Sequence, residues 1–388
     1  MSRDTVVGLF AGIGGIELGL HLAGYRSELL CEIDPAARAV LRSHFPGVHL
    51  DEDVRRLAAL PKVEILAAGF PCQDLSQAGK TAGIGGSHSG LVEHVFRLLG
   101  KRGVAPRWLF LENVPFMLQL HQGKAMRFLV VELERLGYTW AYRVIDARAF
   151  GLPQRRQRVL LLASRTEDPR EILFHGNEEE PEVPHHDKVA CGFYWTEGIR
   201  GLGWAVDAVP TLKGGSTVGI PSPPAIRLPI DRIVLTPDIR DAERLQGFSA
   251  DWTSPALEGG TLRKGARWRL VGNAVSVPVA RWVGERLKAA AGSYDGTGEK
   301  PLAPDEAWPK AAWGAKGKAY RVERSLWPVR EPYQHLADFL AYPGHPLSAR
   351  ATAGFLKRTE ISSLRFRKGF LRDVRAHAVR MRRELASA

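Results

Sequence analysis

The stretch Gly69-Phe70-Pro71-Cys72-Gln73 decides how the rest of the chain is understood. It follows the apolar run 63–68 and opens a Gly- and Ser-rich segment. An apolar run that stops in this way predicts a buried strand that ends in a tight loop. In an open α/β sheet, ligands collect at the carboxyl ends of the strands, so Cys72 is a candidate nucleophile. The alternative is a small residue that packs beneath a loop, since free cysteines are usually buried.

The bulk properties narrow the class of protein. A chain of 388 residues that is 45% hydrophobic can form two or three domains. The formal net charge of +12 suggests a polyanionic partner, most simply nucleic acid. Cys31, Cys72 and Cys191 lie far apart, which argues against disulfides and a zinc site. No apolar run is long enough to span a membrane, and the first one is too short and too early for a secretory signal. We therefore expect a cytoplasmic protein.

The N-terminal part predicts alternating strands and helices. A buried strand over 5–10 leads into a glycine turn and a helix, an arrangement that lets a ligand approach the backbone. Glu32 ends the next strand, 20 residues after Gly12, where such folds hold ribose hydroxyls. Asp53 follows a third, short strand. These strand ends predict a nucleoside-binding crevice, although a lone glycine turn is often only a tight turn and Asp53 could instead cap a helix.

Later strands bring further charged side chains to the sheet. Glu112 ends an apolar strand, where a carboxylate is costly to bury without a partner. It could give or share a proton in the same crevice as Cys72, or it could be a solvated strand end. Gln-Arg-Arg-Gln-Arg precedes the strand 159–163, and strand alternation would put Arg156 and Arg158 on one face. Two arginines there suit a carbonyl oxygen or a phosphate, and a solvated basic edge is the alternative.

After these strands the alternation stops. The acidic, proline-containing segment 178–184 predicts a boundary, and we interpret His185-His186 beside it as a surface pair and not as metal ligands. Residues 291–320 have a linker-like composition. Residues 357–384 carry ten Lys or Arg against three acids. A basic helix there could touch phosphates, and a solvated helix is the alternative.

Seven motifs in this order resemble the DNA (cytosine-5) methyltransferase family. They are Phe10-Ala11-Gly12-Ile13-Gly14-Gly15, Glu32-Ile33-Asp34, Gly69-Phe70-Pro71-Cys72-Gln73, Glu112-Asn113-Val114, Gln154-Arg155-Arg156-Gln157-Arg158, Arg240 with Leu245-Gln246-Gly247-Phe248, and Gly272-Asn273-Ala274-Val275-Ser276-Val277-Pro278. The resemblance covers about residues 5–165 and 235–290, and the order of the motifs makes it specific. It implies an α/β fold, in which a Rossmann-like S-adenosylmethionine-dependent methyltransferase large domain carries a smaller, irregular target recognition domain.

The resemblance also predicts the domain organisation. Residues 1–165 and 270–290 would form the catalytic domain, because the last helix of the family's core would return to pack on the first domain. Residues 166–269, including the returning motif 240–248, would form the target recognition domain. Residues 291–388 would be a linker and a basic C-terminal extension.

The implied reaction is methyl transfer from S-adenosylmethionine to C5 of a cytosine flipped out of duplex DNA. Cys72 would add to C6 and make C5 nucleophilic, while Glu112 would neutralise the charge that develops at N3. Arg156 would hydrogen-bond O2, and Arg158 would orient the base or the glutamate. The implied cofactor residues are Phe10, Gly12, Gly14, Gly15, Glu32, Ile33, Asp53, Val54, Pro71, Asn273 and Val275. The implied DNA contacts are Ser76, Gln77 and Arg240.

The implied partners are double-stranded DNA and a cognate restriction endonuclease or other defence protein encoded nearby. We expect a monomer without a metal ion or a membrane. An RNA cytosine-5 methyltransferase would share this core, but a sizeable module at 166–235 favours duplex DNA. A degenerate, non-enzymatic DNA-binding protein is disfavoured by intact Cys72, Glu112 and Arg156. A nicotinamide-dependent dehydrogenase is disfavoured by the glycine spacing.

Overall fold

The computed structural model describes residues 4–70, 90–101, 103, 106–215, 223–258, 265–289 and 294–387. The chain divides into two compact units. The first holds Met1–Ala149, Gln157–Glu180 and Val275–Arg330, and the second holds Phe150–Arg156, Pro181–Ala274 and Glu331–Ala388. Within the described ranges, no helix is both long and apolar enough to cross a membrane.

The first unit is built on a ten-stranded sheet with the order β14-β16-β15-β6-β8-β5-β4-β1-β2-β3. Its strands are β1 (Thr5–Leu9), β2 (Arg26–Cys31), β3 (His49–Asp51), β4 (Ile65–Ala68), β5 (Trp108–Asn113), β6 (Thr139–Asp146), β8 (Gln157–Ser164), β14 (Lys300–Pro301), β15 (Ala311–Ala315) and β16 (Lys318–Arg321). Strands β1 to β5 pair in parallel, whereas β8 pairs antiparallel with both β5 and β6. The continuous apolar runs of the central strands suit burial on both faces of such a sheet.

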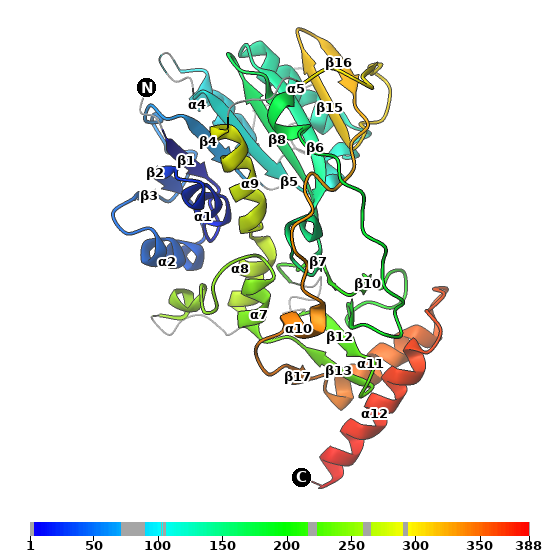
Figure 1. The fold of residues 1–388 in the computed structure, drawn as a ribbon. Coiled ribbons are helices and arrows are strands. Elements are labelled where there is room, and N and C mark those ends of the chain that lie inside the picture. The colour runs from blue at the N-terminus through cyan, green and yellow to red at the C-terminus, as the bar shows by residue number, and fades with distance from the viewer. Residues whose placement is uncertain are drawn as a thin grey trace. The chain divides into compact units, whose positions relative to one another are not determined.

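Helices cover both faces of this sheet (Figure 1). On one face lie α1 (Gly15–Leu22), α6 (Pro169–Leu173) and α9 (Val277–Lys288), and on the other lie α4 (Leu91–Leu99) and α5 (Lys124–Arg135). The remaining helices of this unit are α2 (Pro35–His44), η1 (Pro115–Leu118) and η2 (Ala147–Phe150), the last of which ends in the second unit. Alternate strand residues such as Val7 and Leu9 meet α4 and α5 in one apolar core.

Helix α9 packs on α1, as the resemblance implied for the last helix of the family's core. A Cβ atom added to Gly19 would lie 2.6 Å from the backbone of α9, and one added to Gly284 would lie 2.6 Å from the Cβ of Ala23. The two helices therefore meet at small residues. Lys288 strengthens the contact, because its Nζ donates to the carbonyl oxygen of Gly24 at 2.8 Å.

The structure corrects the linker predicted over residues 291–320. The described part of this segment forms β14, β15 and β16, which extend the sheet beyond β6. Trp308 anchors it, because its Nε1 donates to the carbonyl oxygen of Gly123 at 3.0 Å and its ring packs edge-on against Trp140 at 5.9 Å. The linker-like composition reflects short turns, such as the one at Gly317, where φ is 76°.

The second unit holds a five-stranded antiparallel sheet with the order β10-β9-β12-β13-β17. Its strands are β9 (Cys191–Phe193), β10 (Ala205–Val206), β12 (Ala225–Leu228), β13 (Ile233–Thr236) and β17 (His345–Pro346), and a separate pair joins β7 (Gln154–Arg155) to β11 (Val209–Pro210). Its helices are α7 (Ile239–Arg244), η3 (Ser254–Leu257), α8 (Ala266–Asn273), α10 (Leu336–Phe339), α11 (Ala349–Glu360) and α12 (Phe370–Ser387).

The C-terminal extension is shared between the two units. Residues 294–330 belong to the first unit, and residues 331–387 pack with the segment 181–274 in the second. Phe193 of β9, Phe355 of α11 and Phe370 of α12 form one buried aromatic cluster. The observed units therefore differ from the predicted boundaries, which set residues 291–388 apart as one extension.

Candidate active site

The strand order reverses between β1 and β4, because the chain runs from β1 to β2 and β3 on one side and to β4 and β5 on the other. Ligands of open α/β sheets bind at the carboxyl ends of the strands beside such a point. Phe10 follows β1 there, and Gly69 and Phe70 follow β4. Four predicted site residues lie outside the described residues, and their roles stay predictions: Pro71, Cys72, Ser76 and Gln77.

The glycine turn after β1 combines tight packing with open space. Phe10, Gly12 and Gly14 have φ values of 56°, 55° and 84°. A Cβ atom added to Gly14 would clash with the ring of Phe45, whereas one added to Gly12 would meet no described atom within 4 Å. A ligand can therefore approach the backbone closely at Gly12. Gly15 begins α1, whose N-terminus favours anionic or polar groups.

Glu32 joins the end of β2 to the glycine turn. Its Oε2 accepts from the backbone N–H of Gly12 at 2.8 Å, and its Oε1 accepts from that of Asp34 at 2.8 Å. Burial raises the pKa of this carboxyl group. A carboxylate can accept further hydrogen bonds through its remaining lone pairs, which suits a ribose hydroxyl. Ile33 beside it is 59% exposed and offers an apolar surface to a planar base.

Asp53 is held by its neighbour Arg55 at the end of the third strand. Arg55 Nη2 lies 2.6 Å from Oδ2 of Asp53, and its backbone N–H donates to Oδ1 at 3.0 Å. The hydrogen bond from the Arg55 side chain lowers the pKa of Asp53 to about 2, so the group stays an acceptor at neutral pH. Residues 54–56 form a turn and not a helix, which disfavours the helix-cap alternative. Val54 is buried in the core.

Glu17 of α1 is a buried acid that the sequence reasoning missed. It is 1% exposed, and a Cβ atom added to Gly8 of β1 would clash with its Oε1. Burial is the main cause that raises the pKa of Glu17 to about 8, and the charge of Glu32 adds to it. The carboxyl group is therefore mostly protonated at neutral pH. The available signal was Gly8, which interrupts an otherwise bulky apolar strand and leaves room for a side chain of α1.

Glu112 and Arg158 form a buried pair on neighbouring strands. Arg158 Nε of β8 lies 2.8 Å from Glu112 Oε1 of β5, and their side chains are 11% and 9% exposed. Burial is the main cause that lowers the pKa of Arg158, and Glu112 opposes that effect. A Cβ atom added to Gly69 would lie 3.7 Å from Oε2 of Glu112. The second carboxylate oxygen therefore lies beside the segment that leads to Cys72.

Asn113 ties the two strand ends together. Its Nδ2 donates to the carbonyl oxygen of Phe70 at 2.9 Å, and Asn113 is 5% exposed. This hydrogen bond links the residue after Glu112 to the second residue before Cys72. The Glu-Asn-Val and Gly-Phe-Pro-Cys motifs are thus joined directly.

Arg156 has different partners from Arg158, and this corrects the expectation that the two arginines share one strand face. Arg156 lies between β7 and β8, within the second unit, and is 1% exposed. Its guanidinium donates to the carbonyl oxygens of Leu212 at 3.2 Å, Gly272 at 3.3 Å and Ala274 at 2.5 Å. A buried guanidinium must satisfy its donors, and these carbonyl groups accept from both of its terminal nitrogen atoms. Contact of Arg156 with a base stays a prediction.

The remaining predicted cofactor residues are divided between the two units. Asn273 ends α8 in the second unit, where a Cβ atom added to Gly214 would clash with its side chain. Val275 belongs to the first unit, and its Cγ2 would lie 3.8 Å from a Cβ atom on Gly69.

Arg240 pairs with Asp238 at 2.8 Å and lies 3.9 Å from the ring centroid of Tyr342. Its contact with DNA stays a prediction.

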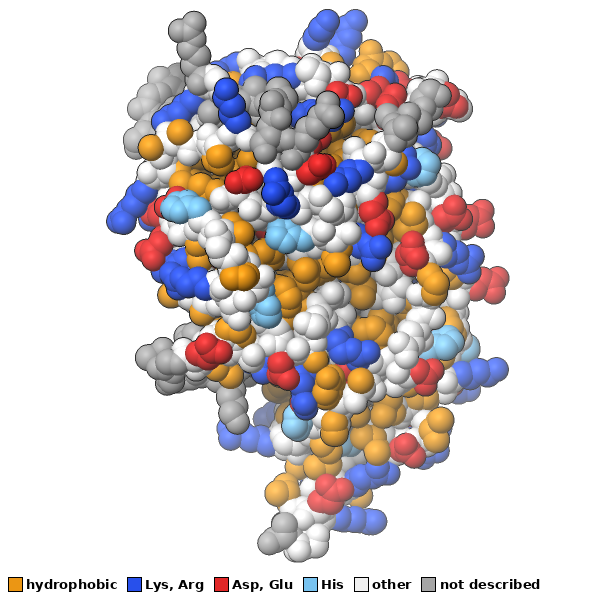
Figure 2. Space-filling model, turned by 60° about the vertical axis from the view of Figure 1, so that its left-hand side comes forward, with side chains coloured by type: hydrophobic (Ala, Val, Ile, Leu, Met, Phe, Trp, Pro, Cys, Tyr) orange, Lys and Arg blue, Asp and Glu red, His pale blue; other side chains and the backbone are white. Residues whose placement is uncertain are grey.

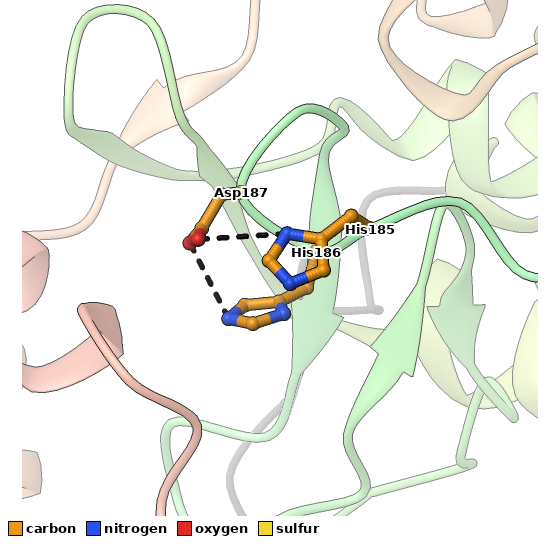
Figure 3. A group of neighbouring side chains, drawn as sticks. All are labelled: His185, His186 and Asp187. Atoms are coloured by element: carbon orange, nitrogen blue, oxygen red, sulfur yellow. Dashed lines mark ion pairs between the residues drawn. The ribbon is translucent and has the colours of Figure 1, made fainter.

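His185, His186 and Asp187 form the cluster drawn in Figure 3. His185 Nδ1 lies 3.5 Å and His186 Nε2 lies 3.3 Å from the carboxylate of Asp187. His186 Nε2 also lies 3.2 Å from the carbonyl oxygen of Lys368, and Arg227 Nη2 lies 3.9 Å from Asp187. Ion pairs and a hydrogen bond account for this arrangement, and the guanidinium opposes a bound cation. The cluster joins residues 185–187 to the segment before α12.

The open sheet, its reversal point and the acidic residues at its strand ends define a class, the Rossmann-like methyltransferases. Residues 5–200 match the family model described as C-5 cytosine-specific DNA methylase. The chain is 53% identical over 362 residues to the Type II methyltransferase M2.BsuMI of Bacillus subtilis, which covers 91% of this chain and 92% of that protein. It is 30% identical over 319 residues to the Type II methyltransferase M.NlaX of Neisseria lactamica, which covers 74% of this chain and 96% of that protein.

The chain therefore belongs to the C-5 cytosine-specific DNA methylase family, and its enzyme class is DNA (cytosine-5-)-methyltransferase. Two solved structures share its fold. The Entamoeba histolytica methyltransferase EhMeth has a TM-score of 0.53 at 16% identity and covers 74% of this chain and 98% of its own. The S. pombe Dnmt2 methyltransferase has a TM-score of 0.52 at 16% identity and covers 74% of this chain and 99% of its own.

Proposed function

We propose that this protein methylates one cytosine within a specific duplex DNA sequence, with S-adenosylmethionine as the methyl donor. We further propose that it is the modification enzyme of a type II restriction-modification system, because the named relatives are type II methyltransferases. The buried Glu112–Arg158 pair carries the proposal, since it lies beside the segment that leads to Cys72.

The first unit fits the donor at three points. A Cβ atom at Gly12 would meet none of the described residues, Glu32 has lone pairs for ribose hydroxyls, and Ile33 offers exposed apolar surface to adenine. Asp53, which stays ionised, would accept from the adenine amino group. When bound, S-adenosylmethionine supplies an electrophilic methyl group. Further residues proposed around it are Phe10, Gly14, Gly15, Val54, Pro71, Asn273 and Val275.

Cytosine C5 is too weak a nucleophile to be methylated directly. In the proposed mechanism the thiolate of Cys72 forms a bond to C6, and the electron pair moves toward N3 and O2. Glu112 would share a proton with N3 through the oxygen that does not face Arg158. The ion pair at 2.8 Å supports a role for Arg158 in orienting that glutamate. After methylation, loss of the C5 proton and departure of Cys72 restore the aromatic ring.

Both members of the Glu112–Arg158 pair are almost fully buried. A base stacked within a duplex could not reach such a carboxyl group, so the proposal requires the cytosine to be flipped out. The cost of unstacking one base is a few kcal/mol, which contacts between protein and DNA must offset.

A methylation assay with bisulfite sequencing tests the proposal. The wild-type protein should transfer a labelled methyl group from S-adenosylmethionine to cytosine at one short sequence in duplex DNA. Cys72→Ala should abolish transfer while DNA binding stays largely intact. Turnover near the wild-type rate in that variant would disprove the nucleophile, and transfer to tRNA in place of DNA would favour the RNA methyltransferase alternative.

A further inference from the structure

Helix α12 is seated firmly on the sheet of the second unit. Phe370, Val374 and His377 are buried along one side of it. Arg227 Nε of β12 lies 2.9 Å from Asp373 Oδ2, and both side chains are at most 2% exposed. A rigid helix of this kind can present its other side to a partner without a large ordering cost.

Further hydrogen bonds hold helix α12 in place along its length. His377 Nε2 donates to the carbonyl oxygen of Leu347 at 2.8 Å, and its Nδ1 accepts from the backbone N–H of Val234 at 3.3 Å. Near the C-terminal end, Arg380 Nη2 donates to the carbonyl oxygen of Asp231 at 3.0 Å. The helix is therefore held to the N-terminal end of β13, to the turn before that strand and to the residue that follows β17.

The opposite side of α12 is a face of exposed arginines. At 100° per residue, Arg372, Arg375, Arg382 and Arg383 fall within one stripe on the side away from the buried residues, and all four are exposed. We call these four residues the α12 arginine face. Arg372 pairs with Asp373 at 3.1 Å, and among the described residues no carboxylate lies within ion-pair distance of the other three.

The α12 arginine face suits a polyanionic partner. Four like charges within about 16 Å of helix repel one another, and a row of phosphates relieves that repulsion. A guanidinium also matches phosphate oxygens with two parallel hydrogen bonds. The segment before the helix adds the exposed residues Arg365, Arg367 and Lys368. Figure 2 shows Lys and Arg side chains interspersed with Asp and Glu side chains over the face that it draws.

We propose that the α12 arginine face contacts the phosphates of duplex DNA outside the base pairs that are read. The inference rests on the proposed function and names a second contact surface for the same substrate. DNA is favoured over an acidic protein because α12 packs on β12 and β13, within the segment predicted to recognise the target. Contacts with phosphates fix the position of a DNA-binding protein along the duplex, but they do not recognise the base sequence themselves.

The test compares two triple variants of the full-length protein. R375A/R382A/R383A removes three charges of the α12 arginine face. R26A/R42A/K62A removes three exposed cations of the first unit and serves as the matched control. Binding to a 30-base-pair duplex is measured by fluorescence anisotropy across a range of salt concentrations.

The binding constant K falls as salt rises, and we expect the steepness of log K against log salt to decrease in the α12 variant by about 0.9 for each lost phosphate contact. We also expect this variant to bind roughly 10- to 100-fold more weakly at physiological salt. Its kcat at saturating DNA and its methylated sequence should equal those of the wild type. R375K/R382K/R383K keeps the charges and should restore most of the slope. R375Q/R382Q/R383Q replaces the alanine variant if thermal melting shows that the latter is unfolded.

Several results would overturn the inference. An unchanged slope in the α12 variant would do so, and so would an equal loss in the control. A loss seen with structured RNA but not with duplex DNA would assign the face to RNA. These results leave methylation by the wild-type protein intact. If the wild type neither binds nor methylates duplex DNA, the proposed function itself fails.

Discussion

Replacing Arg158 by methionine should damage both the stability and the activity of the enzyme. The change leaves the carboxylate of Glu112 buried at 9% exposure without its partner at 2.8 Å. Breaking a buried ion pair from one side typically costs about 3–5 kcal/mol. Glu112 would also lose the group that holds it in place, and the loss of one such electrostatic element lowers kcat by about 10²–10³.

A double-mutant cycle measures this coupling. Urea unfolding gives the free energy of unfolding for the wild type, R158M, E112Q and the double variant. The loss of unfolding free energy in the double variant should be smaller than the summed losses of the two single variants, by about 1–3 kcal/mol. The reason is that the double variant leaves no unpaired buried charge. Single-turnover methylation should be slow in all three variants. Additive destabilisation together with near-normal methylation by R158M would refute the argument that this pair positions Glu112.

Three further predictions follow from other parts of the chain. A duplex with 5-fluorocytosine at the target should trap a covalent adduct on Cys72, because C5 then has no proton to lose; mass spectrometry that finds no adduct with the cofactor present would contradict the mechanism. Gly19→Val should destabilise the first unit by about 1–3 kcal/mol, since a Cβ atom there meets Ala280 and the backbone of α9 at 2.6 Å, and a melting temperature equal to that of the wild type would contradict this. Burial lowers the pKa of His377 below its ordinary value, so the unfolded state binds the proton more readily; the contribution of this group to stability should be full above about pH 6.5 and be lost below it, and H377Q should make the decline in pH-dependent melting shallower than in the wild type.

The sequence predicted the central sheet well because its signals are local. Apolar runs predicted β1, β4, β5 and β8. The end of each strand also located Glu32, Asp53 and Glu112. These assignments required only knowledge of where an apolar run stops.

Partners across strands could not be predicted in the same way. The spacing of Arg156 and Arg158 suggested one shared face, but β7 ends at Arg155 and β8 begins at Gln157, so Arg156 lies between the two strands. One guanidinium then meets Glu112, and the other meets backbone carbonyl groups more than fifty residues away in the chain. The partner of each arginine depends on long-range packing, which the local sequence pattern does not reveal.

The extension shows why its role must be tested by surface substitutions and not by truncation. Arg143 of β6 is fully buried, and its Nε donates to the carbonyl oxygen of Ser325 at 3.0 Å. Burial lowers the pKa of Arg143 to about 9, and acceptors of this kind offset the cost of burying its charge. Removing residues 321–388 would take away Ser325 and would also leave Arg227 buried without Asp373. Both units would then lose a partner for a buried arginine, and weaker DNA binding would report damage to the fold. Substitutions on the exposed side of α12 leave these anchors in place, so a change in the salt dependence of binding can be assigned to the phosphate contacts themselves.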